Sequence, residues 1–529
     1  MRHRLLLSSA IFVGLASLTP TAAFATIDCA GLPAQALLSP GVTAASSTTV
    51  PVGGSVTVAY CQVNLELSPG DPVIKIRVGL PLTGWNGKVR NTGGGGCVGS
   101  VGSVTTATNG GYVGSSTDTG HNNGSCEEAI NLDHTINTRY LDNFIYNSLV
   151  EQIRWAKRLA SMFYGSAPTF NYWDGCSTGG RQGLALAQKA GDELDGILAG
   201  APAFNWNRFQ TAQMWGQIVQ KDLGVVSTTK QNAAAAAARA ACDANDGVTD
   251  GVIDDPRTCT YSAAASFVCV ANGGTSADAN CMTPTEALVQ DKIWDGPRNT
   301  KGKKIWFATE RGGATSALSN SAAPFALGVV QFHWDELDRT FDWHTVTMFG
   351  AGGTKSYAQV AQDGSNNIGL LADTTQPDLN KFRDNGGKLL MWQGMSDQLI
   401  MPRGSIDYYR RVATTMAGGN FATIQPWFRY FRAPGVGHCA GGEGAQPQNL
   451  FNTMVTWRET GVAPDFIQAN GGTGAPPTRT RKLCPYPATA VYNGSGSTDD
   501  MNNFTCSGNI DTPAIVAADT VAKYKFEAQ

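Results

Sequence analysis

The residues Gly175-Cys-Ser-Thr-Gly179 decide the fold class, because they match the pattern G-x-S-x-G in a strand–turn–helix setting. Phe170-Asn-Tyr-Trp173 precedes them as a short predicted strand, and Arg181 to Ala190 follows them as a predicted helix. In such a turn the serine hydroxyl is held exposed at the edge of a sheet, and small residues flank it because the turn is tight. The alternative is an ordinary glycine-rich turn in a chain with 62 glycines. The setting favours a nucleophilic Ser177.

A nucleophilic serine needs a histidine base, which follows it along the chain in folds of this kind. Three histidines lie downstream, namely His333, His344 and His438. His438 stands in a glycine-rich loop after the predicted strand Trp427-Phe-Arg-Tyr-Phe431, where a catalytic histidine belongs. The other two lie among aromatic residues in the middle of the chain, and a hydrogen-bonded structural histidine is the favoured interpretation for each. We therefore predict that His438 is the base.

The acidic member of the site is expected after a strand that lies between the serine and the histidine. Asp397 follows the predicted strand Leu389-Leu-Met-Trp392, a placement that Asp384 and Asp407 lack. The alternative role for Asp397 is to cap a turn, which is a common use of aspartate. In the mechanism that results, the serine attacks an ester carbonyl and the histidine moves the proton. Asp397 orients the imidazole and stabilises its charged form.

Ester hydrolysis on a serine also needs two backbone N–H groups that bind the oxyanion of the transition state. The residue after the nucleophile, Thr178, supplies the first. The glycine tract Gly93 to Gly96 is the natural source of the second, and we expect Gly95 or Gly96 to provide it.

The order of predicted elements indicates one large α/β unit with an insertion. Strands alternate with helices before and after the middle of the chain, which is typical of a sheet with parallel strands. Residues 205–376 interrupt this alternation with an alanine-rich helix at Ala233 to Ala241, four cysteines and clustered aromatic residues. We predict an α/β-hydrolase fold in two parts, 26–204 and 377–529, with a large inserted lid domain at 205–376.

The N-terminus has the three parts of a secretory signal peptide. Met1-Arg-His-Arg4 is basic, Leu5 to Leu18 is apolar, and Ala23-Phe-Ala25 fits the cleavage site. A membrane anchor is the alternative, but this run is shorter than the roughly 20 residues that a helix needs to cross a bilayer. We predict a signal peptide at 1–25, cleavage after Ala25, and a secreted or periplasmic protein.

Two classes of partner are disfavoured by composition. The formal net charge is −3 and no basic block occurs, so the chain lacks the electrostatic footprint of a nucleic-acid-binding protein. No stretch after the predicted signal peptide is apolar for long enough to form a membrane-spanning helix. We expect neither a nucleic-acid partner nor a membrane span.

All 12 cysteines lie after the predicted cleavage site, and their even number suits an oxidising compartment. Up to six disulfides are expected, and the sequence by itself leaves their pairing open. One pair has a geometric reason, because Cys176 precedes the predicted nucleophile and Cys439 follows the predicted base. If serine and histidine touch, these neighbours could come within the roughly 4.4–6.8 Å between Cα atoms that a disulfide requires. Two buried thiols are the alternative.

An acidic, glycine-punctuated loop runs from Cys242 to Asp255. The side chains of Asp243, Asp246 and Asp250 provide hard oxygen ligands, and turns at its glycines can point carbonyls inward. Several carboxylates with oxygen-only ligands suit Ca²⁺. The spacing is not that of an EF-hand, and a solvated acidic loop is the alternative.

These residues resemble the tannase/feruloyl esterase family of α/β-hydrolases, which includes tannases, feruloyl esterases and monohydroxyethyl-terephthalate hydrolases. The most specific mark is the combination of Cys176-Ser177 with His438-Cys439. The similarity covers most of the chain after residue 25, and the other matching segments are Cys61-Gln-Val63, Trp85-Asn-Gly-Lys88, Gly93 to Gly96, Ala156-Lys157, Phe163-Tyr-Gly165, Gly175 to Gln182, Pro402-Arg-Gly404, Asp407-Tyr-Tyr409 and Gly437 to Ala440. The resemblance implies a serine carboxylic-ester hydrolase. It would act on small or polymer-attached esters of aromatic acids, of the feruloyl, galloyl or terephthalate monoester type.

The resemblance also implies how the cysteines and the acidic loop are used. In the family, the two cysteines beside the triad are joined, which implies a Cys176–Cys439 disulfide. The other implied pairs are Cys29–Cys61, Cys242–Cys259, Cys269–Cys281 and Cys484–Cys506, which leaves Cys97 with Cys126. A structural calcium ion in the lid would have as ligands the carboxylates of Asp243, Asp246 and Asp250 and the carbonyls of Val248 and Val252. No organic cofactor is implied.

The lid departs from the family pattern, in which a Trp-x-Phe and an Asp-Pro segment precede the closing strand. The nearest stretches here are Phe332-His-Trp-Asp335 and Phe341-Asp-Trp343, so no substrate contact is transferred to a residue of the lid. Arg311 or Arg339 could bind a substrate carboxylate, although a surface role is favoured for each. The rival functions are a non-catalytic binding module on the same fold and an esterase or lactonase for non-aromatic esters. The filled triad positions disfavour the binding module.

Overall fold

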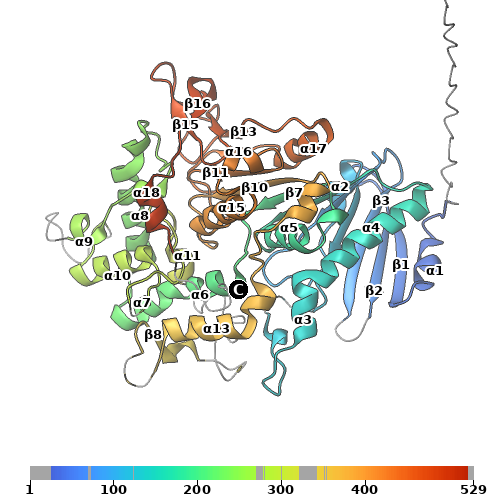
Figure 1. Ribbon diagram of the computed structural model, residues 1–529, viewed down its shortest axis with the longest axis horizontal. Coiled ribbons are helices and arrows are strands. Elements are labelled where there is room, and N and C mark those ends of the chain that lie inside the picture. Colours follow the sequence, from blue (N-terminus) through green and yellow to red (C-terminus); the bar gives the residue numbers. More distant parts are fainter. Residues whose placement is uncertain are drawn as a thin grey trace, which may run out of the picture.

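The computed structural model describes residues 26–521 except 69–72, 123, 125, 270–277, 279, 300, 321–336, 338–341, 351 and 353. The predicted signal peptide at 1–25 therefore lies outside the described residues, as do His333 and Arg339 of the predicted lid. Figure 1 shows two side-by-side parts, a sheet flanked by helices and a mostly helical part.

A nine-stranded sheet forms the centre of the first part (Figure 1). In spatial order its strands are β1 (Val42–Val50), β2 (Tyr60–Leu67), β3 (Ile74–Pro81), β5 (Val113–Thr117), β4 (Lys88–Thr92), β6 (Phe170–Cys176), β7 (Gly196–Gly200), β10 (Lys388–Gly394) and β11 (Phe428–Ala433). The pairs from β1 to β5 are antiparallel, and every pair from β5 onward to β11 is parallel. The three strands predicted around the catalytic residues are β6, β10 and β11, which lie next to or near one another in the parallel half.

Both faces of the parallel half of the sheet are buried, because successive side chains of its strands enter different hydrophobic clusters. In β10, Leu389 and Met391 join one hydrophobic cluster while Leu390 and Trp392 join another. The first cluster includes residues of α4 (Ser148–Tyr164), α5 (Thr178–Lys189) and α15 (Pro402–Ala417), and the second includes residues of α17 (Leu450–Thr460). Because successive side chains of a strand point to opposite faces, these helices cover opposite sides of the sheet. Because both faces are covered, functional polar side chains are expected at the carboxyl ends of the parallel strands.

The chain between β7 and β10 is helical and has its own core. Its longer helices are α6 (Trp206–Gln213), α7 (Trp215–Leu223), α8 (Thr228–Cys242), α10 (Pro284–Asp295) and α13 (Tyr357–Ala372), and its short elements are α9 (Ala263–Ser266), α11 (Ser316–Ser319), β8 (Val346–Thr347) and β9 (Lys355–Ser356). One hydrophobic cluster consists only of residues between 214 and 361. The predicted alanine-rich helix is part of α8. The lid bounds 205–376 stay a prediction.

The remaining helices and strands lie outside the core of this helical part. They are α1 (Leu32–Leu37), α2 (Thr105–Asn109), α3 (Thr138–Asp142), α14 (Asn380–Asp384), α16 (Phe421–Ile424), β12 (Gln446–Pro447), β13 (Ile467–Asn470), β14 (Thr480–Leu483), β15 (Thr489–Tyr492), β16 (Phe504–Ser507) and α18 (Pro513–Ala518). A π-helical segment at Asn143–Asn147 joins α3 to α4. Among the described helices, none combines the length and the apolar character needed to cross a membrane.

Candidate active site

Ser177 occupies the turn between the end of β6 and the start of α5, with φ 63° and ψ −125°. A non-glycine residue at positive φ is strained, at a cost of about 1–3 kcal/mol, and such strain concentrates at functional sites. The Ser177 amide donates to the carbonyl of Gly200 in the neighbouring strand at 3.0 Å, which helps to hold the turn. A Cβ at position 175 would lie 2.4 Å from the backbone of Gly179, so only glycine fits there. The predicted strand–turn–helix geometry is present.

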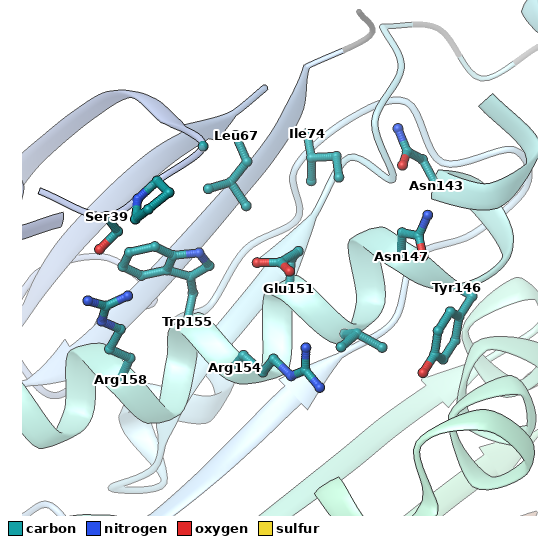
Figure 2. A pocket seen from close by; sticks show the side chains of 13 residues that line it. Ser39, Leu67, Ile74, Asn143, Tyr146, Asn147, Glu151, Arg154, Trp155 and Arg158 are labelled. Carbon is teal, nitrogen blue, oxygen red and sulfur yellow. The ribbon is translucent and has the colours of Figure 1, made fainter. Parts of the chain in front are cut away.

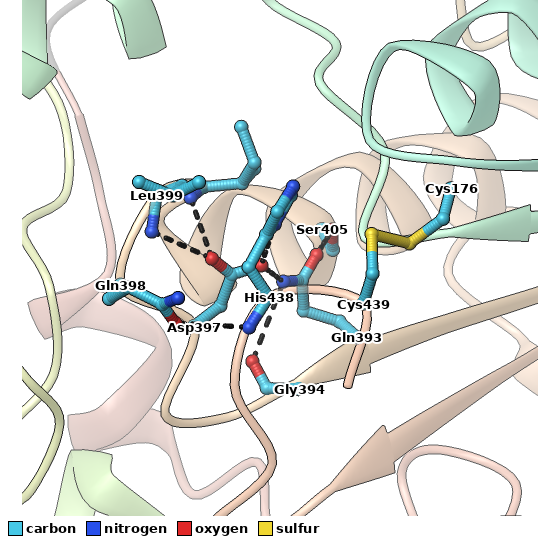
Figure 3. Close-up of a disulfide and its surroundings, with 10 residues drawn as sticks. Cys176, Gln393, Gly394, Asp397, Gln398, Leu399, Ser405, His438 and Cys439 are labelled. Atoms are coloured by element: carbon cyan, nitrogen blue, oxygen red, sulfur yellow. Dashed lines mark hydrogen bonds and ion pairs between the residues drawn. A yellow bond between two sulfur atoms is a disulfide. The ribbon is translucent and has the colours of Figure 1, made fainter. Parts of the chain in front are cut away.

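His438 and Asp397 lie together at the carboxyl ends of β11 and β10. The Asp397 carboxylate accepts a hydrogen bond from His438 Nδ1 at 2.9 Å (Figure 3). The Asp397 side chain is fully buried, whereas the imidazole is 12% exposed. The two loops approach so closely that a Cβ on Gly394 would lie 2.4 Å from the backbone oxygens of Val436 and Gly437. The predicted acid and the predicted base are therefore in contact, with Nε2 of the imidazole left for a substrate or nucleophile.

Three polar residues that the sequence analysis did not identify fix this pair. Gln393 Nε2 donates to Asp397 Oδ2 at 2.8 Å, and Ser405 Oγ donates to Gln393 Oε1 at 3.0 Å (Figure 3). Gln398 Oε1 accepts from the backbone amide of His438 at 3.0 Å. The backbone amides of residues 399 and 400 donate to Asp397 Oδ1 at 2.8 Å each. Both carboxylate oxygens are thus satisfied, which orients the aspartate toward the imidazole.

A disulfide joins the residue before the serine to the residue after the histidine. Cys176 and Cys439 are bonded, with 6.0 Å between their Cα atoms (Figure 3). The structure records no hydrogen bond from Ser177 Oγ to His438 among the residues it describes. Catalytic hydrogen bonds are often long before substrate binds, so the lack of this hydrogen bond does not decide the roles of Ser177 and His438. The disulfide nevertheless keeps the two segments adjacent across a separation of 263 residues.

The glycine tract after β4 lies against the start of α5. The Gly94 amide donates to Gln182 Oε1 at 3.0 Å, and the Thr178 hydroxyl donates to the Gly96 carbonyl at 2.6 Å. Within the described part of the chain, no acceptor is recorded for the amides of Gly95, Gly96 and Thr178. A Cβ at either of these two glycines would meet nothing within 4 Å, so they face open space. The three amides predicted for the oxyanion are thus available.

Comparison with known proteins gives the family. The sequence model described as "Tannase and feruloyl esterase" matches residues 61–507. A probable feruloyl esterase of Arthroderma benhamiae is 34% identical over 474 residues, which cover 85% of this chain and 86% of the relative. The chain belongs to the tannase and feruloyl esterase family.

Two further relatives place this family member in its fold and reaction class. The mono(2-hydroxyethyl) terephthalate hydrolase of Piscinibacter sakaiensis is 28% identical over 510 residues, which cover 82% of this chain and 81% of the relative. The crystal structure of feruloyl esterase B from Aspergillus oryzae has a TM-score of 0.76 at 26% identity, and the match covers 88% of this chain and 96% of that one. The predictions of an α/β-hydrolase fold and of a carboxylic ester hydrolase are confirmed.

The structure contains six disulfides, and no described cysteine is free. Besides the bond beside the triad, the pairs are Cys29–Cys61, Cys97–Cys126, Cys242–Cys259, Cys269–Cys281 and Cys484–Cys506. These are the pairs that the family resemblance implied. Disulfides of this number form and persist in oxidising compartments, which fits an extracellular protein.

The acidic loop predicted to bind calcium is folded on its own hydrogen bonds. The Asp243 carboxylate accepts from the backbone amides of residues 250, 251 and 252, and Asp250 accepts from the guanidinium of Arg481 at 2.5 Å. Burial, together with the carboxylates of Asp246 and Asp250, raises the pKa of Asp254 well above its usual range. Among the described residues, no three or more His, Cys, Asp and Glu side chains are grouped as a preformed metal site.

Two other features lie apart from this site. A hollow of about 550 Å³ runs along α4, with Tyr146, Glu151, Arg154 and Trp155 among its lining residues (Figure 2). None of the predicted catalytic residues lines it, so it is not the active site. His344, the other described histidine after the serine, is exposed and pairs with its neighbour Asp342, as a structural histidine would.

Proposed function

We propose that this chain is a secreted serine hydrolase that cleaves esters of aromatic acids through an acyl-enzyme. One observation carries the proposal: the contact between His438 and Asp397 is joined to the strained Ser177 turn by the Cys176–Cys439 disulfide. Two relatives, a probable feruloyl esterase and a mono(2-hydroxyethyl) terephthalate hydrolase, support an aromatic acyl group.

In the first half-reaction, Ser177 Oγ would attack the ester carbonyl while His438 Nε2 takes the hydroxyl proton. The negative charge on the former carbonyl oxygen would be stabilised by the Thr178 amide and by the amide of Gly95 or Gly96. Asp397 would stabilise the imidazolium through the contact with Nδ1. As the bond to the alcohol oxygen breaks, His438 returns the proton to that oxygen and the acyl group stays on Ser177.

In the second half-reaction, His438 would take a proton from water, and the resulting hydroxide attacks the acyl-enzyme. The same oxyanion-binding amides would stabilise the second tetrahedral intermediate. Collapse of this intermediate releases the aromatic acid and returns the proton to Ser177. Figure 1 shows the helical part beside the sheet, and its helices would supply the walls that recognise the acyl group.

A substrate panel tests the proposed acyl specificity. The mature enzyme is assayed with methyl ferulate, methyl gallate, mono(2-hydroxyethyl) terephthalate and p-nitrophenyl acetate, with Ser177→Ala as the control for non-enzymatic hydrolysis. We expect kcat/KM for at least one aromatic ester to exceed that for p-nitrophenyl acetate after correction for intrinsic reactivity. Turnover of the acetate with none of the three aromatic esters would favour an esterase or lactonase for non-aromatic esters. Binding without any turnover would favour the binding module.

We also propose that the acidic loop binds a structural calcium ion. Its donors, all oxygen, fit this ion, and Asp246, Asp250 and Asp254 line one small hollow together with Val248 and Val252. Asp243, Asp246, Asp250 and backbone carbonyls of the loop would hold it and tie the loop together. Because the ion would bind only the folded state, EDTA should lower the Tm, by the equivalent of about 2.7 kcal/mol at a hundredfold excess of calcium over Kd. An unchanged Tm with no calcium by elemental analysis would contradict this.

We also propose that the protein is exported after removal of residues 1–25. A basic, apolar and small-residue sequence at 1–25 and six disulfides support passage through an oxidising compartment. N-terminal sequencing of the protein recovered outside the cytoplasm should begin at Thr26. A chain that stays in the cytoplasm and retains Met1 would contradict it.

A further inference from the structure

Gly95 and Gly96 face open space, so the position of their amides depends on the bonds that neighbouring residues and carbonyls of the same loop make. The backbone at Gly96 has φ 53°, and both glycines lack side chains that could pack. An oxyanion is stabilised only by amides that lie about 2.7–3.1 Å from its oxygen, so a small movement of this loop matters. The loop is fixed at Gly94 by Gln182 and at Gly96 by Thr178, both on α5. Both contacts therefore come from the first turns of α5.

A further contact comes from the turn after β5, where the side chain of His121 reaches the same loop. His121 is fully buried, and its Nε2 contacts the carbonyl oxygen of Cys97, the residue directly after the glycine tract. A carbonyl oxygen only accepts, so Nε2 carries a hydrogen and donates to Cys97, while Nδ1 lies 3.3 Å from both the hydroxyl and the carbonyl oxygen of Thr119. Burial lowers the pKa of His121, which keeps the imidazole neutral. The histidine is not needed for any proton transfer in the proposed mechanism.

The turn that presents His121 is itself rigid. Thr119 and Gly120 both have positive φ, 63° and 80°. The Asp118 carboxylate accepts from the amides of Lys75 and Gly120 at 2.9 and 2.8 Å, and the Asp118 carbonyl accepts from the amide of Gly99 at 3.0 Å. The end of β5 therefore holds the glycine loop twice, once through the backbone and once through the imidazole.

Two aromatic rings also pack against the imidazole. The rings of Tyr140 and Phe144 lie 4.5 and 5.8 Å from that of His121. The guanidinium of Arg181, one turn after the nucleophile on α5, lies 4.5 Å from the Phe144 ring and donates to the Phe144 carbonyl at 3.1 Å. The histidine is thus connected on its far side to the helix that begins at Ser177.

We propose that His121 is a positioning residue that sets the oxyanion-binding amides of Gly95 and Gly96 through its hydrogen bond to the Cys97 carbonyl. This rests on the proposed roles of Ser177 and the glycine loop. The competing explanation is that the Cys97–Cys126 disulfide alone holds the loop, in which case the imidazole only fills space. The two explanations differ in what they require at position 121, namely a donor or only bulk.

The experiment compares His121→Gln with His121→Met. The two side chains have nearly the same length and volume, but only the glutamine Nε2 can donate to the Cys97 carbonyl. Displacements of about 1 Å can cost roughly a hundredfold in rate. We expect kcat on p-nitrophenyl acetate to fall about 10- to 100-fold in His121→Met with little change in KM, and to be at least tenfold higher in His121→Gln. Equal kcat for the two folded variants would overturn the proposal.

A second measurement covers the case in which His121→Met does not fold. The wild-type enzyme is crystallised after reaction with a phosphonate that labels the nucleophile. We expect the phosphonyl oxygen within about 2.7–3.1 Å of the Thr178 amide and of the Gly95 or Gly96 amide, with His121 Nε2 on the Cys97 carbonyl. An imidazole turned away from Cys97 in that adduct would overturn the proposal. Absence of any label on Ser177 would instead overturn the proposed function.

Discussion

Aspartate carboxylates are used differently in two regions of the molecule. One region is the acid–base pair of the site, and the other is the junction where the inserted segment meets α15 and the region around α18. At the site one carboxylate, Asp397, has every oxygen assigned to a neutral donor or to the imidazole, and a disulfide fixes the surroundings. At the junction, several carboxylates and guanidinium groups share partners, so no single pair is decisive. The site gains precision from directional bonds, whereas the junction gains cohesion from charge.

The junction ion network is defined by Arg257, Arg403 and Arg410 with their acidic partners. The Arg257 side chain is 1% exposed and pairs with Asp255 at 2.8 Å and with Asp511 at 3.0 Å. The other pairs are Arg403–Glu310, Arg403–Asp519, Arg410–Asp511, Arg410–Asp519 and Arg257–Asp519. These residues come from the inserted segment, from α15 and from the region around α18. The network therefore joins three parts of the chain, and none of its members is one of the predicted catalytic residues.

The largest effect on activity is expected when the nucleophile or the base is replaced. Ser177→Ala and His438→Ala should each lower kcat by about 10⁴- to 10⁶-fold, and the double variant should lose little more, because triad residues act as a unit. Steady-state kinetics with a thermal melt of each variant measures this. Additive losses in the double variant would mean that the two residues do not act together.

The next effect comes from the disulfide beside the site. Cys176→Ala/Cys439→Ala should lower kcat by up to about a hundredfold while the protein is still folded, because the serine and histidine segments can then separate by an ångström or more. Loss of so long a closed loop also removes on the order of 4–5 kcal/mol by the chain-entropy argument. The matched control is Cys269→Ala/Cys281→Ala, which removes a disulfide of the lid. Equal activity losses in both would show that the effect is general destabilisation.

The junction should respond in stability and not in rate. Asp511 accepts from Arg257, Arg410 and Tyr486, so Asp511→Asn leaves buried guanidinium groups under-compensated, at a cost of about 3 kcal/mol. We expect a lower Tm with kcat unchanged. Asp465→Asn is the matched control, because that carboxylate is 93% exposed and its pair with Arg429 should contribute little. A fall in kcat without a fall in Tm would contradict the contrast between the two regions.

The same network predicts a pH dependence. Burial alone would raise the pKa of Asp255, but the charges of Arg432 and Arg257 outweigh it and hold the pKa at about 2. Because this folded-state pKa lies below the unfolded value of about 3.9, the stabilisation is present above pH 4 and is lost as the pH falls toward 2. Acid unfolding of Asp255→Asn should show a shallower loss of Tm in that window than wild type. Identical pH profiles would contradict the assignment.

The smallest effect concerns Asp118 behind the glycine loop. Burial raises its pKa to about 6, above the unfolded value, so the folded state takes up this proton more readily. Stability should therefore rise as the pH falls from about 6 to 4, and this contribution should vanish in Asp118→Asn, whose amide oxygen can still accept from the same two amides. The difference in Tm between wild type and variant, measured from pH 7 to 4, checks the sign. A difference that does not change with pH would contradict it.

The parts of the site that follow strands were accessible from sequence, and the parts that depend on tertiary contacts were not. Ser177, Asp397 and His438 each follow a recognisable strand, because parallel strands of one sheet present their carboxyl ends at one edge. Gln393, Ser405 and His121 carry no local signal, because glutamine, serine and histidine are common polar residues and their partners lie elsewhere in the fold. Asp254 was likewise missed among the many carboxylates of the acidic loop.

The lid is the region in which the sequence predicted least about the site. Its alanine-rich run predicted α8, whereas its other helices and its own core were not predicted from the sequence. The residues that would contact the acyl group could not be assigned, since the stretch from Phe332 to Asp335 departs from the family pattern and lies outside the described residues. Substrate choice therefore rests on the similarity to relatives, whereas the reaction class rests on the family as a whole.

The most direct test of the central claim is reaction with a fluorophosphonate followed by mass spectrometry of the digested protein. If Ser177 is the nucleophile, one equivalent of reagent will abolish ester hydrolysis and the adduct will lie on the peptide that contains Ser177. The same treatment of Ser177→Ala will leave that peptide unmodified. An enzyme that keeps its activity after complete labelling, or an adduct on a different residue that accounts for the inhibition, would contradict the account.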